Sequence, residues 1–187
     1  MTVGYALTGS FCTLSRSLKV LGALCAQGHT VVPIMSETVY STDTRFFEAA
    51  KLRAVVEGLC KKEIIHTVKD AEPLGPAHPL DALIIAPCTG NTISKMANGI
   101  TDTAVTMAAK AHLRTDKPLL IALASNDAMS ANLANLASLL MRKSVYILPM
   151  RQDDPTGKPH SLVADFEMLP EAFIKMLDGK QMTPLFL

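Results

Sequence analysis

The chain has 187 residues, of which 49% are hydrophobic and 19% charged, and its formal net charge is +1. This length and composition predict a single medium-sized α/β domain, residues 1–187, with a sizeable core. The balanced charge leaves no basic stripe and argues against a nucleic-acid partner. No apolar run has transmembrane length, and residues 3–7 begin a strand without a preceding signal segment. We therefore expect a soluble cytoplasmic protein with no membrane partner.

Strand and helix patterns alternate along the chain. Short apolar runs predict strands at 3–7, 30–35, 63–66, 82–86, 118–124 and 145–148. Helical patterns are predicted at 14–27, 45–60, 92–97, 103–113, 129–141 and 170–177. The alternation predicts a Rossmann-like, doubly wound parallel sheet in a three-layer α/β/α fold. The polar stretch 149–161 is expected to be a mobile flap.

Small polar residues follow four of the predicted strands. They are Thr8, Gly9 and Ser10 after the first strand, Ser36 after the second, Thr89, Asn91 and Thr92 after the strand at 82–86, and Ser125 after the strand at 118–124. Each has a purely structural explanation, because such residues also cap helices and form turns. Parallel strands place their carboxyl ends at one edge of the sheet, where ligands bind in this fold class. Their convergence therefore predicts a pocket for a phosphate or a flat heterocycle.

The first of these turns, Thr8-Gly9-Ser10, lacks the GxGxxG form of a dinucleotide fingerprint, and this favours a mononucleotide phosphate. The four cysteines show no metal-ligand spacing, so no metal is expected. Cys25 and Cys60 fit helix interiors. Cys12 and Cys88 lie in strand-to-helix turns, where they can contact a ligand, but neither has a neighbouring base that would make it a nucleophile.

The pattern Ala-Pro-x-x-x-Asn-Thr-x-x-Lys-x-x-x-Gly-x-x-Asp spans residues 86–102. With Gly-Ser after the first strand and Ser after the second, it resembles the flavoprotein family over residues 3–150. That family includes FMN-dependent cysteine and phosphopantothenoylcysteine decarboxylases and the flavin prenyltransferases. The resemblance implies a homo-oligomer that binds FMN, often where two copies meet. The residues it implies for FMN are Thr8, Gly9, Ser10, Ser36, Cys88, Thr89, Thr92 and Ser125, with Arg114 at the phosphate.

The same resemblance implies two catalytic residues. Asn91 matches the active-site Asn of the decarboxylases, and His66 resembles their catalytic His at the end of an upstream strand. By itself, His66 also fits an ordinary surface or core histidine. The chain departs from the decarboxylases in two places. Its connection from His66 to Ala86 is longer, and their Pro-x-Met-Asn sequence is replaced by residues 125–129, Ser-Asn-Asp-Ala-Met.

Longer strings, at 4–13, 33–36, 40–46, 86–103 and 151–155, resemble one branch of this family, whose members act in dipicolinate formation by sporulating bacteria. That branch implies a small dicarboxylate substrate and a partner protein similar to nicotinamide-dependent dehydrogenases. NAD(P) is expected on the partner alone. Lys95, Arg151 and Lys158 would bind the substrate carboxylates. Removal of two hydrogens would make the chain part of an oxidoreductase.

Two other functions remain open at this point. The chain could be a non-catalytic component that stabilises or regulates its partner. Alternatively, it could be an FMN-dependent decarboxylase of cysteine-type substrates.

Overall fold

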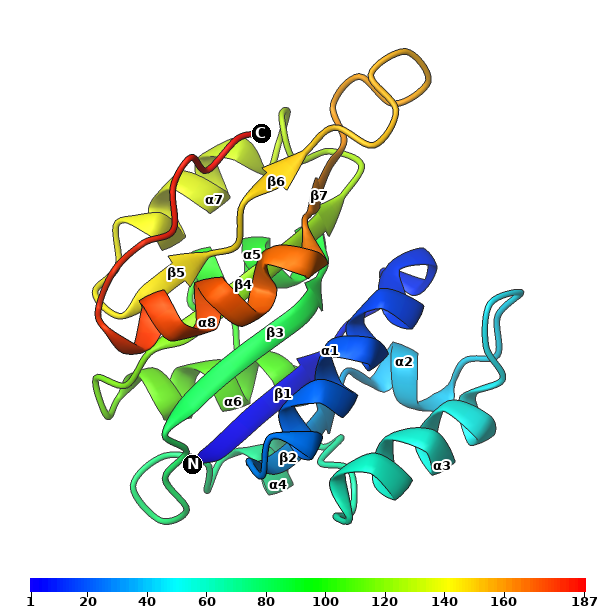
Figure 1. Ribbon diagram of the computed structural model, residues 1–187, viewed down its shortest axis with the longest axis vertical. Helices are drawn as coiled ribbons and strands as arrows, with labels where there is room; N and C mark the ends of the chain where they lie inside the picture. Colours follow the sequence, from blue (N-terminus) through cyan, green and yellow to red (C-terminus); the bar gives the residue numbers. More distant parts are fainter.

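The computed structural model describes residues 1–187 (Figure 1), and a seven-stranded sheet runs through its centre. The strands are β1 (Thr2–Leu7), β2 (Thr30–Met35), β3 (Ala82–Cys88), β4 (Leu119–Ser125), β5 (Val145–Ile147), β6 (Met150–Arg151) and β7 (Leu162–Ala164). Their order is β2-β1-β3-β4-β7-β6, and β5 also pairs with β4. Strands β1 to β5 pair in parallel, whereas β7 is antiparallel to both β4 and β6.

Helices cover both faces of this sheet (Figure 1). They are η1 (Phe11–Thr13), α1 (Leu14–Ala26), α2 (Glu37–Ser41), α3 (Ala49–Cys60), α4 (Val68–Ala71), α5 (Gly90–Ala97), α6 (Ala104–Leu113), α7 (Leu133–Leu140), η2 (Phe166–Met168) and α8 (Leu169–Leu177). One apolar cluster joins α1, α3 and α8 to the sheet, and a second joins α4, α5, α6 and α7 to its other face. The predicted Rossmann-like, three-layer architecture is confirmed. None of the helices has the length and apolar character needed to cross a membrane.

Strand β3 explains why its sequence reads as an unbroken apolar run. Ala82, Ile84 and Ala86 pack into the first cluster, whereas Leu83 and Ile85 pack into the second. Successive side chains of a strand point to opposite faces, and both faces are covered here. The strand continues through Pro87 to Cys88, two residues beyond the predicted end. Its carboxyl end therefore opens directly onto α5.

Four predictions differ from the structure. The helix predicted at 45–60 begins only at Ala49, because the backbone of the preceding residues is bent or extended. The strand predicted at 63–66 is only a single bridge, between Ile34 and Ile65. The helix predicted at 129–141 is restricted to α7, because turns centred on Asp127 occupy the preceding residues. The sheet is not purely parallel, since part of the polar stretch 149–161 forms β6 and pairs antiparallel with β7.

A segment after α8 covers the outer side of β6. The Met150 N–H donates to the Leu185 carbonyl, and the Leu187 N–H donates to the Met150 carbonyl, both at 2.9 Å. The Gln181 side chain accepts from the Ile147 N–H and donates to the Ile147 carbonyl. Residues 181–187 are thereby fixed along the end of the sheet.

The buried His112 is expected to make the free energy of unfolding depend on pH. Its ring is fully buried in α6, Nε2 lies 2.9 Å from the Pro118 carbonyl, and Nδ1 has no partner. Burial lowers the pKa of His112, and nearby Lys117 adds to this effect. The unfolded chain therefore takes up a proton at a higher pH than the native protein does.

The free energy of unfolding is thus expected to fall as the pH drops below about 6.5, the ordinary pKa of histidine. Denaturant titrations across this range should show a shallower pH dependence for His112→Gln, which keeps a donor for Pro118 but does not titrate. The exposed His78 supplies the control, His78→Gln, which should retain the wild-type slope. An unchanged slope in His112→Gln would contradict the assignment.

Candidate functional site

Two adjoining cavities lie at the carboxyl ends of the parallel strands. The first, here called the hydroxyl cavity, has a volume of about 300 Å³ and no hydrophobic residue in its lining. The second, here called the mixed cavity, has a volume of about 600 Å³ and is lined by both aromatic and charged side chains. Gly9 and Thr89 line both. The two cavities therefore form one continuous region at the sheet edge where ligands bind in this fold class.

Thr8 holds together two of the loops that form this region. Its buried Oγ1 donates to the Pro87 carbonyl and accepts from the Thr89 N–H, each at 2.9 Å. The Thr8 N–H also donates to the Pro87 carbonyl. This side chain thereby ties the loop after β1 to the start of α5, whose N-terminus adjoins both cavities.

The structural explanation is also correct for two of the predicted hydroxyls, those of Thr89 and Ser36, whereas the Ser10 side chain makes no capping bond. Thr89 caps α5 by accepting from the Thr92 N–H, and Ser36 caps α2 by accepting from the Val39 N–H. Capping leaves other N–H groups of each first turn without an intrahelical partner. Both caps line the hydroxyl cavity, so its lining combines hydroxyl groups with the positive ends of two helices, together with the charged side chains of Glu37 and Lys95.

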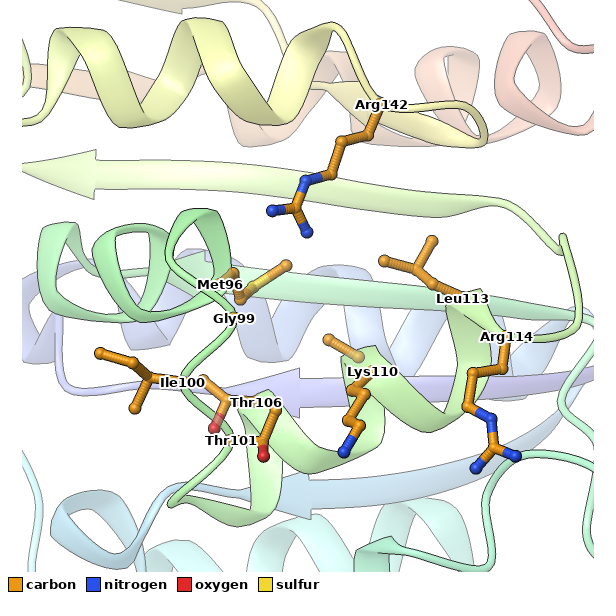
Figure 2. A pocket seen from close by; sticks show the side chains of 10 residues that line it. Met96, Gly99, Ile100, Thr101, Thr106, Lys110, Leu113, Arg114 and Arg142 are labelled. Carbon is orange, nitrogen blue, oxygen red and sulfur yellow. The ribbon is translucent and has the colours of Figure 1, made fainter.

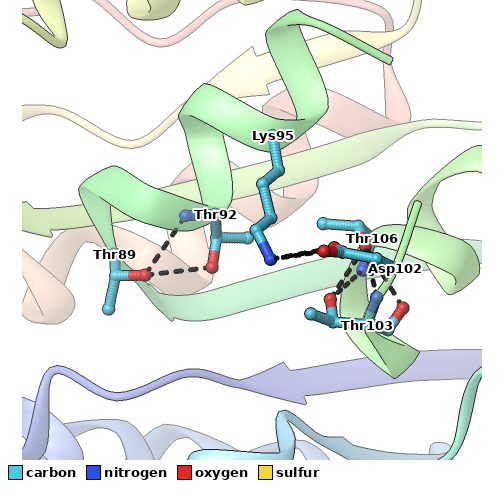
Figure 3. Close-up of polar contacts among 6 residues, drawn as sticks. All are labelled: Thr89, Thr92, Lys95, Asp102, Thr103 and Thr106. Atoms are coloured by element: carbon cyan, nitrogen blue, oxygen red, sulfur yellow. Dashed lines mark hydrogen bonds and ion pairs between the residues drawn. The ribbon is translucent and has the colours of Figure 1, made fainter. Parts of the chain in front are cut away.

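A polar network borders the hydroxyl cavity, and its members Lys95 and Thr103 line that cavity (Figure 3). Lys95 Nζ lies 2.9 Å from both carboxylate oxygens of Asp102. The hydrogen bond from Lys95 lowers the pKa of Asp102. Thr103 and Thr106 cap the N-terminus of α6 reciprocally, each side chain accepting from the other residue's backbone N–H. Residues 95–106 thus form a hydrogen-bonded wall.

The carboxylate of Asp127 lines the mixed cavity and is held by a hydroxyl donor and an amide donor. The Ser125 hydroxyl donates to Asp127 Oδ1, and Asn132 Nδ2 donates to Oδ2 at 2.8 Å. These bonds, the one from Ser125 above all, lower the pKa of Asp127. Two cations also line this cavity. Lys158 pairs with Asp153 at 3.1 Å, and the Arg45 guanidinium lies 4.8 Å from the centre of the Phe46 ring.

Most of the predicted site residues line these two cavities. The hydroxyl cavity contains Thr8, Gly9, Ser36, Thr89, Asn91, Thr92 and Lys95, and the mixed cavity contains Gly9, Ser10, Thr89, Ser125 and Lys158. A single chain does not bring the other four predicted residues into either cavity. These are His66, Cys88, Arg114 and Arg151.

His66 lies in an aromatic stack beside the region. Its ring stacks on Tyr40 with centroids 3.7 Å apart, and the Arg53 guanidinium lies 4.7 Å from the centre of the Tyr40 ring. The Cys88 thiol is fully buried, and burial raises its pKa, so it stays protonated and unreactive.

The two arginines lie elsewhere. Arg151 pairs with Asp165 and lines a separate polar cavity. Arg114 lies at the end of α6 opposite Thr103, about 15 Å away along a ten-residue helix. A single chain therefore leaves both arginines away from the hydroxyl cavity.

Several residues that line the mixed cavity are not among the predicted site residues, including Arg45, Phe46 and Asp127. The helix predicted at 45–60 includes Arg45 and Phe46, whereas α3 begins only at Ala49 and leaves both residues in the preceding loop. Asp127 lies two residues after the end of β4, and its position in the replaced Pro-x-Met-Asn segment was a signal that could have identified it.

Comparison with known proteins identifies the family of this chain. Residues 1–166 match the family model described as Flavoprotein. The chain belongs to the flavoprotein family. It is 42% identical, over 183 residues, to the B subunit of dipicolinate synthase from Bacillus subtilis (strain 168), an alignment that covers 98% of this chain and 92% of that protein. It is 27% identical, over 141 residues, to the flavin prenyltransferase UbiX of Chlamydia muridarum, covering 72% of this chain and 71% of that protein.

Solved flavoprotein structures show the same fold. The crystal structure of the B subunit of dipicolinate synthase from Bacillus halodurans C superposes with a TM-score of 0.91 and 41% identity, covering 100% of this chain and 95% of that chain. The FMN-dependent cysteine decarboxylase SpaF superposes with a TM-score of 0.70 and 20% identity, covering 94% and 97% of the two chains. The identity to the second structure supports a shared fold alone.

Proposed function

We propose that this chain, acting as one domain, is the FMN-binding component of a cytoplasmic dipicolinate synthase in a sporulating cell. Together with the A subunit of that enzyme, it forms dipicolinate from a dihydrodipicolinate-type intermediate of the lysine pathway. The similarity to the B subunit of dipicolinate synthase carries the proposal, because it extends over nearly the full length of both proteins. NAD(P) is assigned to the A subunit alone.

The two cavities fit the parts of FMN. The hydroxyl cavity, with no apolar lining and two capped helix N-termini, suits a ribityl phosphate. The mixed cavity, with Phe11 and Phe46 in its lining, suits a flat ring. Bound FMN would supply a two-electron acceptor for the oxidation of the substrate. The hydroxyl, amide and backbone groups around Thr8, Ser36 and Thr89 would hold and orient it.

Substrate recognition is proposed for the cations at the same edge. Lys158 in the mixed cavity and Lys95 in the hydroxyl cavity would bind carboxylate groups, with Arg151 approaching from the adjoining polar cavity. Asn91 would position the substrate by hydrogen bonds. The stretch 149–161, which carries Lys158, would act as a flap. The Lys158–Asp153 pair would then have to exchange partners on binding.

His66 is proposed as the base that takes the proton released when the substrate becomes aromatic. A homo-oligomer would supply this group, and Arg114 for the phosphate, from a neighbouring copy, because one chain places both outside its own cavities.

Two measurements test the proposal. Titration of the purified chain with FMN should perturb the flavin absorption spectrum with saturable binding, and absence of binding would exclude the flavin role. Dipicolinate formation should require both proteins. It should fall about 100-fold or more in His66→Ala, the typical cost of losing a positioned acid–base group, and about tenfold in Asn91→Ala, through the loss of a hydrogen bond worth about 1.4 kcal/mol.

The same assay separates the alternatives. If the chain only stabilises its partner, Asn91→Ala and His66→Ala should each support dipicolinate formation as well as the wild type does. The decarboxylase alternative has weaker support, because Asp127 and Ser125 occupy the segment where the decarboxylases have Pro-x-Met-Asn. Turnover of a peptide ending in cysteine would favour it.

A further inference from the structure

A third cavity, here called the outer cavity, lies beside α6 and has a volume of about 360 Å³ (Figure 2). Met96, Ile100, Ala109 and Leu113 give it an apolar lining from α5, α6 and the loop between them. Its size falls within the range of small-ligand sites, about 300–1,000 Å³. The proposed function uses one of its lining residues, Arg114, at the phosphate of a neighbouring copy, but not the cavity itself.

Three cations surround the apolar lining. Lys110 and Arg114 extend from neighbouring turns of α6, and Arg142 extends from the residues after α7 toward Met96 (Figure 2). None of the three forms an ion pair within the chain, and no acidic residue lines the cavity. Arg142 Nη2 donates to the Ala97 carbonyl at 2.8 Å, which anchors that guanidinium beside the cavity.

Apolar walls with unpaired cations around them select a particular kind of ligand. The apolar part of a ligand gains binding free energy by leaving water, and an anionic group on the ligand gains charge-assisted hydrogen bonds to the cations. The volume limits the apolar part to a compact group. A one-ring aromatic carboxylate meets all three conditions, whereas an amine of the same shape would be repelled.

The outer cavity and the hydroxyl cavity share a wall. Gly99, Ile100 and Thr101 line the outer cavity, and Thr103, two residues further along, lines the hydroxyl cavity. Thr106 lines the outer cavity and exchanges capping hydrogen bonds with Thr103 (Figure 3). A ligand that immobilises this wall on one side therefore restrains it on the other.

We infer that the outer cavity is an effector site for compact aromatic carboxylates, and that its occupancy stiffens the wall of the hydroxyl cavity. Within one chain the outer cavity is separate from the two cavities proposed for FMN, and its test needs neither FMN nor a partner protein. In the isolated chain, Arg114 lines this cavity and neither of the other two.

Calorimetric titration of the FMN-free protein with benzoate tests the site, with benzylamine as the control of opposite charge. Benzoate is expected to bind and benzylamine not to bind. The double variant Lys110→Met/Arg114→Met should weaken benzoate binding about tenfold or more, through loss of charge-assisted hydrogen bonds. The exposed Lys180→Met is the matched control and should bind benzoate as the wild type does.

Amide hydrogen exchange tests whether binding in the outer cavity stiffens the wall of the hydroxyl cavity. Saturating benzoate should slow exchange of the Thr103 and Thr106 amides severalfold in the wild type but not in the double variant. Failure of benzoate to bind, equal binding of benzylamine, or full affinity in the double variant would each overturn the site. Binding with unchanged exchange at both amides would overturn the stiffening of that wall.

Discussion

Thr8→Val is expected to weaken FMN binding about tenfold or more. Valine keeps the shape of threonine but cannot accept the hydrogen bond from the Thr89 N–H or donate to Pro87. The Pro87 carbonyl keeps its bond from the Thr8 N–H, whereas the Thr89 N–H loses its partner. The loop after β1 and the start of α5 are then no longer held in one arrangement, and a conformational cost of about 1.4 kcal/mol paid on binding corresponds to a tenfold loss of affinity.

Equilibrium titration with FMN gives the affinity, and denaturant unfolding gives the stability. Thr115→Val is the matched control, because it also removes a threonine hydroxyl that donates to a backbone carbonyl. That carbonyl belongs to His112, at the C-terminal end of α6 and away from both cavities. That variant should lose stability and keep its FMN affinity. Equal FMN affinities for Thr8→Val and the wild type would show that the link between the two loops does not shape the site.

Gly90→Ala is expected to disrupt the mixed cavity and to reduce stability by about 1–3 kcal/mol, a typical cost of overpacking. A Cβ at this position would lie 2.4 Å from Ser125 Oγ, 2.6 Å from Asn132 Nδ2 and 2.7 Å from Asp127 Oδ1. All three atoms belong to the hydrogen-bonded group that holds the Asp127 carboxylate. The methyl group cannot enter without separating them.

The control for this variant is Gly58→Ala, in the interior of α3, where a Cβ would meet nothing within 4 Å. That change should stabilise the protein by about 0.5–1 kcal/mol, because alanine suits a helix better than glycine. Thermal unfolding and dipicolinate formation measure the two effects. Normal stability and activity in Gly90→Ala would mean that the Asp127 group adjusts freely and plays no part in the site.

The sequence predicted the central sheet well because its signals are local. The apolar run at 82–86 is a strand whose two faces are both covered, and any such strand in an alternating chain favours a parallel sheet. The polar residues after β1, β2, β3 and β4 could be grouped for the same reason, since parallel topology brings strand ends together. That argument correctly placed Thr8, Ser36, Thr89 and Ser125 around adjoining cavities.

What the sequence did not reveal depends on contacts between distant residues. His66 lies beside Tyr40 through stacking, and no period in the sequence encodes that contact. Strands β6 and β7 are two and three residues long, too short for an alternation to be recognised. The turns at Asp127 replaced a predicted helical start because its side chain and carbonyl bond locally to Asn132 and Ser130.

The segment at 185–187 has a consequence for the behaviour of the protein in concentrated solution. The backbone groups of Met150 that face away from β7 are both occupied, by Leu185 and Leu187. A sheet edge with free N–H and C=O groups is a template for pairing with another chain. Because residues 185–187 occupy these groups, the β6 edge cannot pair with a strand of another molecule there, and this disfavours aggregation through that edge.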